Sequence, residues 1–99
     1  MEDLETILLF ETRHGQVNDL LGGLISLRSA YWGDQYHAKV PDEAEIKRLE
    51  EEMLFFSALR SRALLMSIEE MTLVLEQYRP QFKEEDKIRR EYEAARGGT

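Results

Sequence analysis

The segment between residues 42 and 66 limits the possible folds more than any other part of the chain. It reads DEAEIKRLEEEMLFFSALRSRALLM, and its apolar residues recur at steps of three and four, as expected for a helix. Its first half is acidic, whereas its second half contains the consecutive apolar runs 54–56 (LFF) and 64–66 (LLM). One helix face cannot hold three neighbours in a row. We therefore expect the second half of this helix to be covered from more than one side.

A second amphipathic helix is predicted for residues 3–30. The residues on its seven-residue repeat are Phe10, Val17, Leu20, Leu24, Leu27 and Tyr31. Gly22 and Gly23 interrupt this region, and each costs about 1 kcal/mol relative to alanine in a helix interior. Either the helix breaks there, or Gly22, Ser26 and Ala30 form a small-residue stripe where another helix approaches closely. Because the periodicity continues on both sides, we expect a continuous helix with at most a bend.

Residues 31–40 (YWGDQYHAKV) are predicted to connect these two helices. Gly33 can adopt the left-handed conformation that ends a helix, and Asp34 favours a turn. Long ordered loops with several aromatic residues often carry a binding function. Trp32 and Tyr36 are therefore candidate contacts to a partner, although these rings could also simply cover the end of the helical core.

The C-terminal part is predicted to form helices at residues 68–79 and 81–96, because the ring of Pro80 clashes with the preceding helical turn. Ser67 and Glu70 fit a capping box that would start a new helix at residue 68. The alternative is one helical axis from residue 42 to 79, and we lean towards it because no glycine or proline precedes Ser67 in this segment. Residues 97–99 are expected to be a disordered tail.

The composition indicates an all-α protein that associates with itself. Ninety-nine residues suit one domain, here residues 1–96, and such a chain buries only about 60–68% of its unfolded surface. Apolar residues make up 42% of the chain, more than so small a core can hide. We therefore expect an antiparallel helical hairpin, extended by a C-terminal helix, that completes a helical bundle as a homodimer.

Charge and residue usage exclude several classes of partner. The net charge is −7, from 20 acidic and 13 basic residues, which argues against direct binding of nucleic acid. The chain has no cysteine, so it has neither disulfides nor thiolate metal sites. Its start is acidic, and the apolar run at residues 7–10 is too short to span a membrane. We expect a cytoplasmic protein without a membrane partner.

Glu11 and His14 are the first candidate for metal ligands in a helical bundle. A carboxylate and an imidazole three residues apart share a helix face, and di-iron bundles repeat such a pair on two helices. The second pair of this spacing in the chain, Asp34 and His37, falls in the predicted loop. We interpret His14 as a histidine at the edge of the core and not as a metal ligand. No serine has the sequence context of a catalytic triad. We therefore expect no enzymatic activity, no catalytic residue, no cofactor and no bound metal.

The function most in keeping with these features is that of a small non-catalytic interaction module: an adaptor, a chaperone or an inhibitor. Phe55, Leu59 and Leu65 are the predicted interface residues, because large apolar side chains on an exposed helix face anchor interfaces. The basic pair Arg60 and Arg62 could form ion pairs with acids of the first helix or of a partner subunit.

Two alternatives from other classes remain. The row Glu50, Glu51 and Glu52 could bind a basic surface, as in an acidic inhibitor of a nucleic-acid-binding protein. Less favoured is a metal-binding helical-bundle enzyme that uses Glu11 and His14.

Overall fold

The computed structural model describes residues 3–97 and is built from helices joined by short connections over that range, which confirms the all-α part of the predicted fold class. The helices are α1 (Leu4–Tyr36), α2 (Glu43–Arg62) and α3 (Ile68–Gly97), with a short 3-10 helix, η1 (Ala63–Leu65), between α2 and α3. No strand occurs within residues 3–97. None of the helices in this range combines the length and apolar composition that a membrane-spanning helix needs.

Helix α1 is longer than predicted. Asp3 caps its start by accepting a hydrogen bond from the Thr6 amide at 2.8 Å, and the helix continues through both central glycines. It ends at Tyr36 rather than near residue 30, so the connecting loop is shorter than expected. The predicted left-handed cap at Gly33 is wrong, because no residue within 3–97 has a positive φ. The stacked rings of Trp32 and Tyr36, 5.0 Å apart, support the extra turn because residues four apart share a helix face.

Helix α2 starts as predicted, because Asp42 accepts a hydrogen bond from the Glu45 amide at 3.1 Å. The single helical axis towards which we leaned for residues 42–79 is wrong. The chain leaves the helix after η1, and Met66 has an extended backbone with ψ of 145°. The alternative, a cap at Ser67, is confirmed: its Oγ accepts a hydrogen bond from the Glu70 amide at 3.1 Å. A serine cap therefore starts α3 without any help from glycine or proline.

Helix α3 runs through Pro80 without ending, so the predicted boundary between residues 79 and 81 is wrong. The proline removes one backbone donor and crowds the preceding turn, but contacts further along keep α3 helical. Arg89 forms an ion pair with Asp34 of α1 at 2.6 Å. Gly97, expected in the disordered tail, is the last residue of α3, and the other two tail residues, 98 and 99, lie outside the described range.

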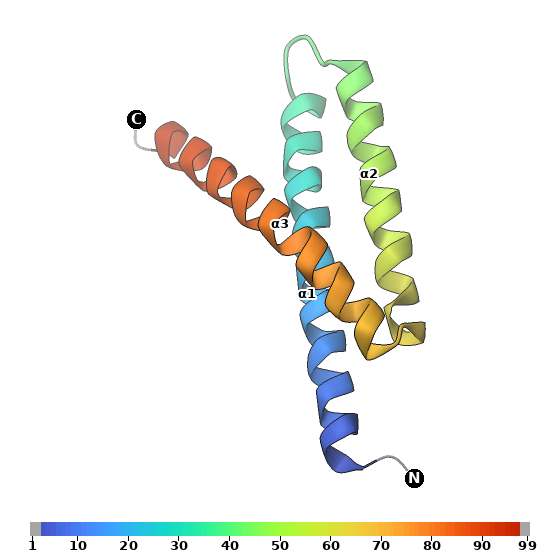
Figure 1. Ribbon diagram of the computed structural model, residues 1–99. Coiled ribbons are helices and arrows are strands. Elements are labelled where there is room, and N and C mark those ends of the chain that lie inside the picture. The colour runs from blue at the N-terminus through green and yellow to red at the C-terminus, as the bar shows by residue number, and fades with distance from the viewer. Residues whose placement is uncertain (1–2, 98–99) are drawn as a thin grey trace.

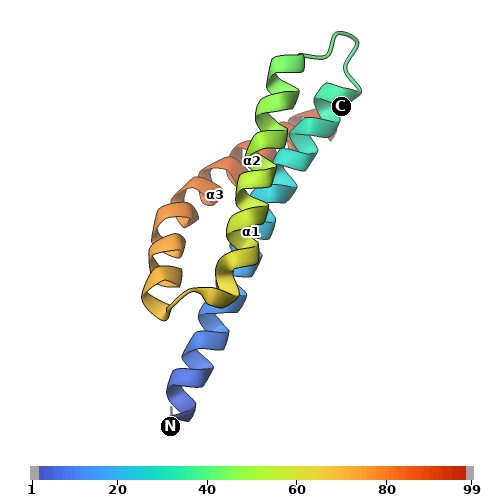
Figure 2. The same cartoon turned by 90° about the vertical axis from the view of Figure 1, so that its right-hand side faces the viewer.

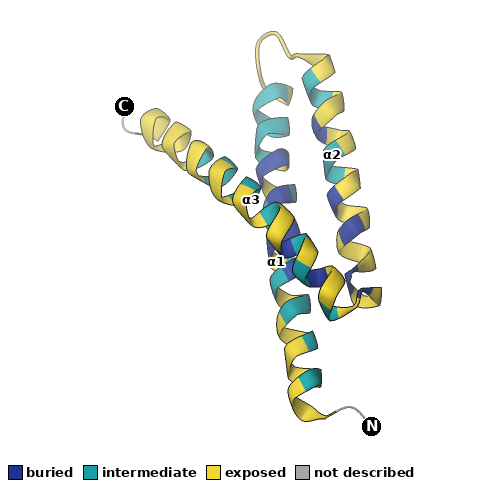
Figure 3. Cartoon of the chain, in the orientation of Figure 1, coloured by how far each residue is buried: buried dark blue, intermediate teal, exposed yellow. Residues whose placement is uncertain are grey.

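Helices α1 and α2 lie side by side and run in opposite directions, while α3 begins beside the end of α2, crosses α1 and ends beyond it (Figures 1 and 2). The buried core lies where the three helices meet (Figure 3). Its buried members are Val17, Leu20, Leu21, Leu24, Phe56, Leu59, Ala63, Met66, Met71 and Leu75. The molecule measures 59 × 28 × 16 Å, and its radius of gyration is 16.6 Å. A compact domain of this length has a radius of about 13 Å, so the molecule is strongly elongated.

The two adjacent glycines of α1 are approached by two different helices. A Cβ atom added to Gly22 would lie 3.3 Å from the guanidinium of Arg60 on α2. A Cβ atom added to Gly23 would lie only 2.6 Å from the ring of Phe82 on α3. Long side chains from both neighbouring helices therefore fill the space beside the two glycines. The predicted small-residue stripe does not form one helix contact, because its member Ser26 is exposed.

Candidate functional site

The first turns of α1 extend beyond the rest of the molecule. At 1.5 Å per residue, the 33 residues of α1 span about 50 Å and the 20 residues of α2 about 30 Å. The two helices are level at the short loop that joins them, so α1 must project at its other end. Figures 1 and 2 show residues 4–12 passing the turn between α2 and α3. We call these residues the N-terminal arm.

The N-terminal arm is rich in exposed apolar side chains. Leu4 is 68% exposed and Leu8 51% exposed, and Ile7 and Leu9 are also exposed. Because Leu8 and Leu9 are successive, their side chains point about 100° apart, so the arm is apolar on more than one side. Phe10, within the arm, packs against the core and anchors the arm to the body. A helix that is apolar on several sides is normally buried.

The turn between α2 and α3 presents a second exposed apolar group at the same end of the molecule. Ala63 is buried in the core, whereas Leu64 is exposed and Leu65 is 87% exposed. Leu65 lines a hollow of about 190 Å³ together with Arg62, Met66 and Glu70. We call residues 62–66 the α2–α3 turn.

A shallow groove runs between α1 and α2. It has a volume of about 350 Å³ and is lined by Ile25, Glu50, Met53, Leu54 and Ser57. Leu54 at its edge is exposed. Phe55 is also exposed and packs edge-on against Phe56, with ring centroids 5.3 Å apart. Leu54 and Phe55 therefore add to the exposed apolar surface, but they belong to the part of α2 that packs in the body of the molecule.

The predicted partner-binding residues do not form one surface. Leu59 is only 7% exposed and belongs to the core, because it faces the seam where the three helices meet. Leu65 and Phe55 are exposed on separate elements. Trp32 is partly buried and Tyr36 exposed, both on the last turns of α1 near the loop. The arm leucines were not predicted as contact residues, although residues 7–10 form an apolar run like the run at 54–56.

The acidic row on α2 is divided between solvent and the interior. Glu50 and Glu51 are exposed, but Glu52 forms an ion pair with Arg48 at 2.7 Å and lies 3.6 Å from Arg28. Three successive residues on a helix point in three directions. The row therefore does not present a joint carboxylate surface of the kind that the inhibitor hypothesis requires.

An ionic centre at Arg28 joins all three helices. The side chain is 6% exposed, and its two terminal nitrogens donate to the carboxylate of Glu85 at 2.8 and 3.0 Å. It also donates to the Leu24 carbonyl oxygen at 3.0 Å and lies over the Phe56 ring at 4.8 Å. Burial raises the pKa of Glu85, but hydrogen bonds from Arg28 and Gln81 outweigh burial, so the pKa lies below its ordinary value.

This ionic centre suits a structural role, because Arg28 is buried and its contacts connect α1 to Glu52 of α2 and Glu85 of α3. Its position could have been suspected from the sequence, since Arg28 interrupts the apolar stripe next to the seven-residue repeat. A second set of contacts lies at the far end of α3. Arg89 forms an ion pair with Asp34 at 2.6 Å, and its guanidinium lies 5.1 Å from the ring centroids of both Tyr31 and Tyr92.

The residues considered for metal binding are not brought together. Glu11 is exposed on the arm, and the partly buried His14 stacks on Phe10 with ring centroids 6.4 Å apart. His37 lies at the far end of α1, where it follows the last helical residue. Among residues 3–97, no group of three or more histidine, cysteine, aspartate or glutamate side chains is placed to hold a metal ion.

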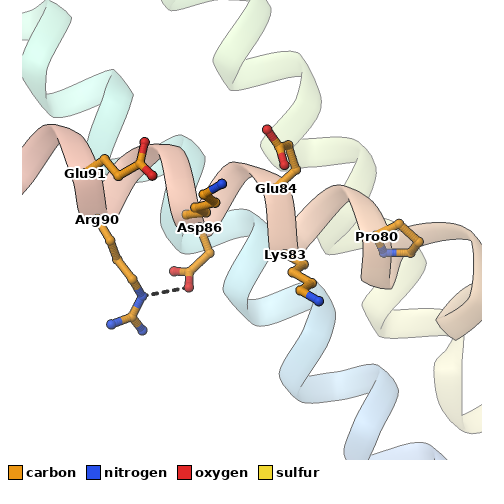
Figure 4. Close-up of a pocket in the computed structure, with 7 residues that line it drawn as sticks. Pro80, Lys83, Glu84, Asp86, Arg90 and Glu91 are labelled. Atoms are coloured by element: carbon orange, nitrogen blue, oxygen red, sulfur yellow. Dashed lines mark hydrogen bonds and ion pairs between the residues drawn. The ribbon is translucent and has the colours of Figure 1, made fainter.

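The hollow with the largest volume among those described, about 600 Å³, lies along the outside of α3 (Figure 4). All of its lining residues belong to that one helix, so it cannot enclose a ligand. They are Pro80, Lys83, Glu84, Asp86, Lys87, Arg90 and Glu91. Positive and negative side chains alternate there, and Arg90 forms an ion pair with Asp86 at 2.7 Å. This surface has the properties of a solvated helix face.

Comparison with models of protein families, with curated proteins and with solved structures finds no match to this chain. The candidate site is therefore defined by its geometry alone: the N-terminal arm, with the α2–α3 turn beside its base.

Proposed function

We propose that this protein is a small non-catalytic interaction module that works as a homodimer and uses the N-terminal arm as its main contact surface. The observation that carries the proposal is the exposure of Leu4, Ile7, Leu8 and Leu9 on a regular helix that projects from the body. Water-exposed leucines on several sides of a helix are costly, so a helix of this kind is stabilised by an apolar neighbour.

The exposed area supports the same proposal. The accessible surface is 7211 Å², whereas a compact monomer of this mass exposes about 5,800 Å². The excess is about 1,400 Å², and a stable interface of standard size buries about 800 Å² on each partner. The molecule therefore has enough surplus surface for a homodimer, which is the assembly that would complete a helical bundle.

Light scattering tests this proposal through a double substitution in the arm, Leu4→Ser with Leu8→Ser. We expect the unsubstituted protein to have the mass of a dimer and the double variant the mass of a monomer, because two exposed apolar anchors are lost. A matched control replaces Leu54 and Leu73, which are exposed elsewhere, with serine, and it should stay dimeric. An unsubstituted protein that remains monomeric at high concentration would contradict the proposal, and circular dichroism checks that each variant is folded.

A further inference from the structure

The N-terminal arm and the α2–α3 turn lie at one end of the molecule, and each carries exposed apolar and charged side chains. Both views show that the arm projects past the α2–α3 turn and continues away from it (Figures 1 and 2). The arm therefore leaves Leu64 and Leu65 of its own turn exposed. A second arm that arrives from the opposite direction would pass directly alongside that turn.

We infer that two copies meet end to end about a two-fold axis at this end, with their arms antiparallel and each arm against the partner's α2–α3 turn. The inference rests on the homodimer proposed above and specifies its geometry. A two-fold arrangement is closed, because the arm-to-turn contact occurs twice and no further copy can add to it.

The distribution of apolar side chains favours a second copy over an unrelated helix. Leu8 and Leu9 point in different directions, so one neighbouring helix would cover the arm on one side only. In the two-fold arrangement the partner supplies two surfaces, its arm and its turn. The same contact also covers Leu65, the most exposed large apolar residue of the turn.

Charge complementarity points to the same pairing. Glu5 and Glu11 are exposed on the arm, and neither has an ion-pair partner within residues 3–97. Arg62 on the turn is exposed and also lacks an ion pair over the same range. Its neighbour Arg60 is engaged within the molecule, because it donates a hydrogen bond to Asn18 at 2.8 Å. Pairing of an acidic arm residue with Arg62 of the partner is a complementary contact, beside Glu70, which lines the same hollow as Leu65, and the two-fold axis repeats it.

Cysteine cross-linking tests this geometry cleanly, because the chain has no cysteine of its own. A protein carrying Leu8→Cys is mixed with one carrying Leu65→Cys, and a short bis-maleimide is added after subunit exchange. We expect a covalent dimer that contains one copy of each variant. In the control, Val40→Cys takes the place of Leu8→Cys. Val40 is as exposed to solvent as Leu65 but lies in the loop at the opposite end of the molecule, so this pair should cross-link little.

Three outcomes separate the two proposals. An arm-to-turn cross-link well above the control supports the inference. A dimer by light scattering in which Leu8→Cys and Leu65→Cys do not cross-link, or do so no faster than the control, overturns the geometry and leaves the homodimer standing. A monomer overturns both.

Charge reversal provides a second readout. Arg62→Glu would place like charges together twice in each dimer, and we expect dimerisation to weaken by about tenfold or more. Mixing this variant with a protein carrying Glu5→Arg and Glu11→Arg should restore pairing. If Arg62→Glu dimerises as well as the unsubstituted protein, the arm does not contact the turn.

Discussion

Individual side chains determine where α3 lies on the other two helices. Arg28 is buried and connects α1 to Glu85 of α3 by two hydrogen bonds. The Nε atom of Arg28 is buried without a hydrogen-bond partner within residues 3–97 and lies 3.6 Å from Glu52, so the two bonds to Glu85 carry the contact. Breaking such a pair costs more than forming it gains. Gly23 acts in a different way, because its missing side chain leaves room for the ring of Phe82. Both contacts fix the crossing of α3 over α1.

The ionic centre predicts a specific loss of stability in acid. The folded-state pKa of Glu85 lies below the ordinary value of 4.5, so its contribution is fully present above that pH and is lost as the pH falls through the folded-state pKa. At neutral pH, Glu85→Gln should lower the free energy of unfolding by about 1–3 kcal/mol.

Urea denaturation of the unsubstituted protein and of Glu85→Gln between neutral and acidic pH, at one protein concentration, measures this effect. The difference in their free energies of unfolding should be constant above the ordinary pKa of glutamate and should shrink below it. Glu84→Gln is the control, because Glu84 is exposed and has no ion pair within residues 3–97. A difference that does not change with pH would show that the Glu85 carboxylate charge is not what stabilises the contact.

The glycines of α1 predict opposite responses to the same substitution. Gly15 has nothing within 4 Å of an added Cβ atom, so Gly15→Ala should raise the free energy of unfolding by about 0.5–1 kcal/mol through helix propensity. Gly23→Ala forces the Phe82 ring to move, which costs about 1–3 kcal/mol and outweighs that gain. Thermal and urea denaturation check both variants, and equal effects would mean that α3 does not pack on Gly23.

Helix ends decide how the chain turns between elements. Asp3, Asp42 and Ser67 each accept a hydrogen bond from the amide three residues later, and such caps satisfy donors that the helix leaves free. The cap at Ser67 matters most for the topology, because it separates α3 from α2 and so allows α3 to fold back across α1. The helix interior is more tolerant, since α3 continues through Pro80.

The cap at Ser67 gives a testable prediction with a control close by in the sequence. Ser67→Ala should lower the free energy of unfolding by about 1 kcal/mol, because the Glu70 amide loses its acceptor. Ser61 donates only to the Ser57 carbonyl within α2, at 3.0 Å, so Ser61→Ala should be neutral or slightly stabilising. Chemical denaturation at one protein concentration compares them. A Ser67→Ala variant as stable as the control would contradict the role of the cap.

The shape of the whole molecule is governed by unequal helix lengths. Because α1 is 13 residues longer than α2, its first turns project beyond the other helices of the described range (Figures 1 and 2), and the molecule is extended to 59 Å in its longest dimension. Exposed large apolar residues occur at the arm and the nearby turn, and others lie in the α1–α2 loop and on α2 and α3. Stability and association are therefore expected to be coupled, since the same apolar groups would be buried only in the assembly.

This coupling predicts that the thermal midpoint depends on protein concentration. For a homodimer, mass action favours the folded dimer, so the midpoint should rise steadily over about a hundredfold range of concentration. The Leu4→Ser, Leu8→Ser double variant should lose this dependence. Differential scanning calorimetry measures both. A midpoint of the unsubstituted protein that is independent of concentration would be inconsistent with the homodimer.

The sequence predicted the candidate site only in part. It indicated surplus apolar surface and singled out Leu65, which is exposed, but it placed Leu59 on the surface and overlooked Leu4 and Leu8. The reason is that periodicity shows which side of a helix is apolar, but not whether a neighbour reaches that far along it. Whether the arm is covered depends on the relative lengths and offsets of two helices, which no local pattern contains.

The helical class, the cap at Asp42 and the core repeat of α1 follow from the sequence by itself, because each depends on residues within a few positions of one another. The cap at Ser67 was only one of two alternatives that the sequence left open, and the extended backbone at Met66 decided between them. Only the tertiary structure decided that α3 continues past Pro80, that Arg28 is buried and that the N-terminal arm is exposed. These features depend on contacts such as that of Arg28 with Glu85, residues 57 positions apart. Local propensities cannot anticipate such contacts, because their energy appears only once the helices are packed together.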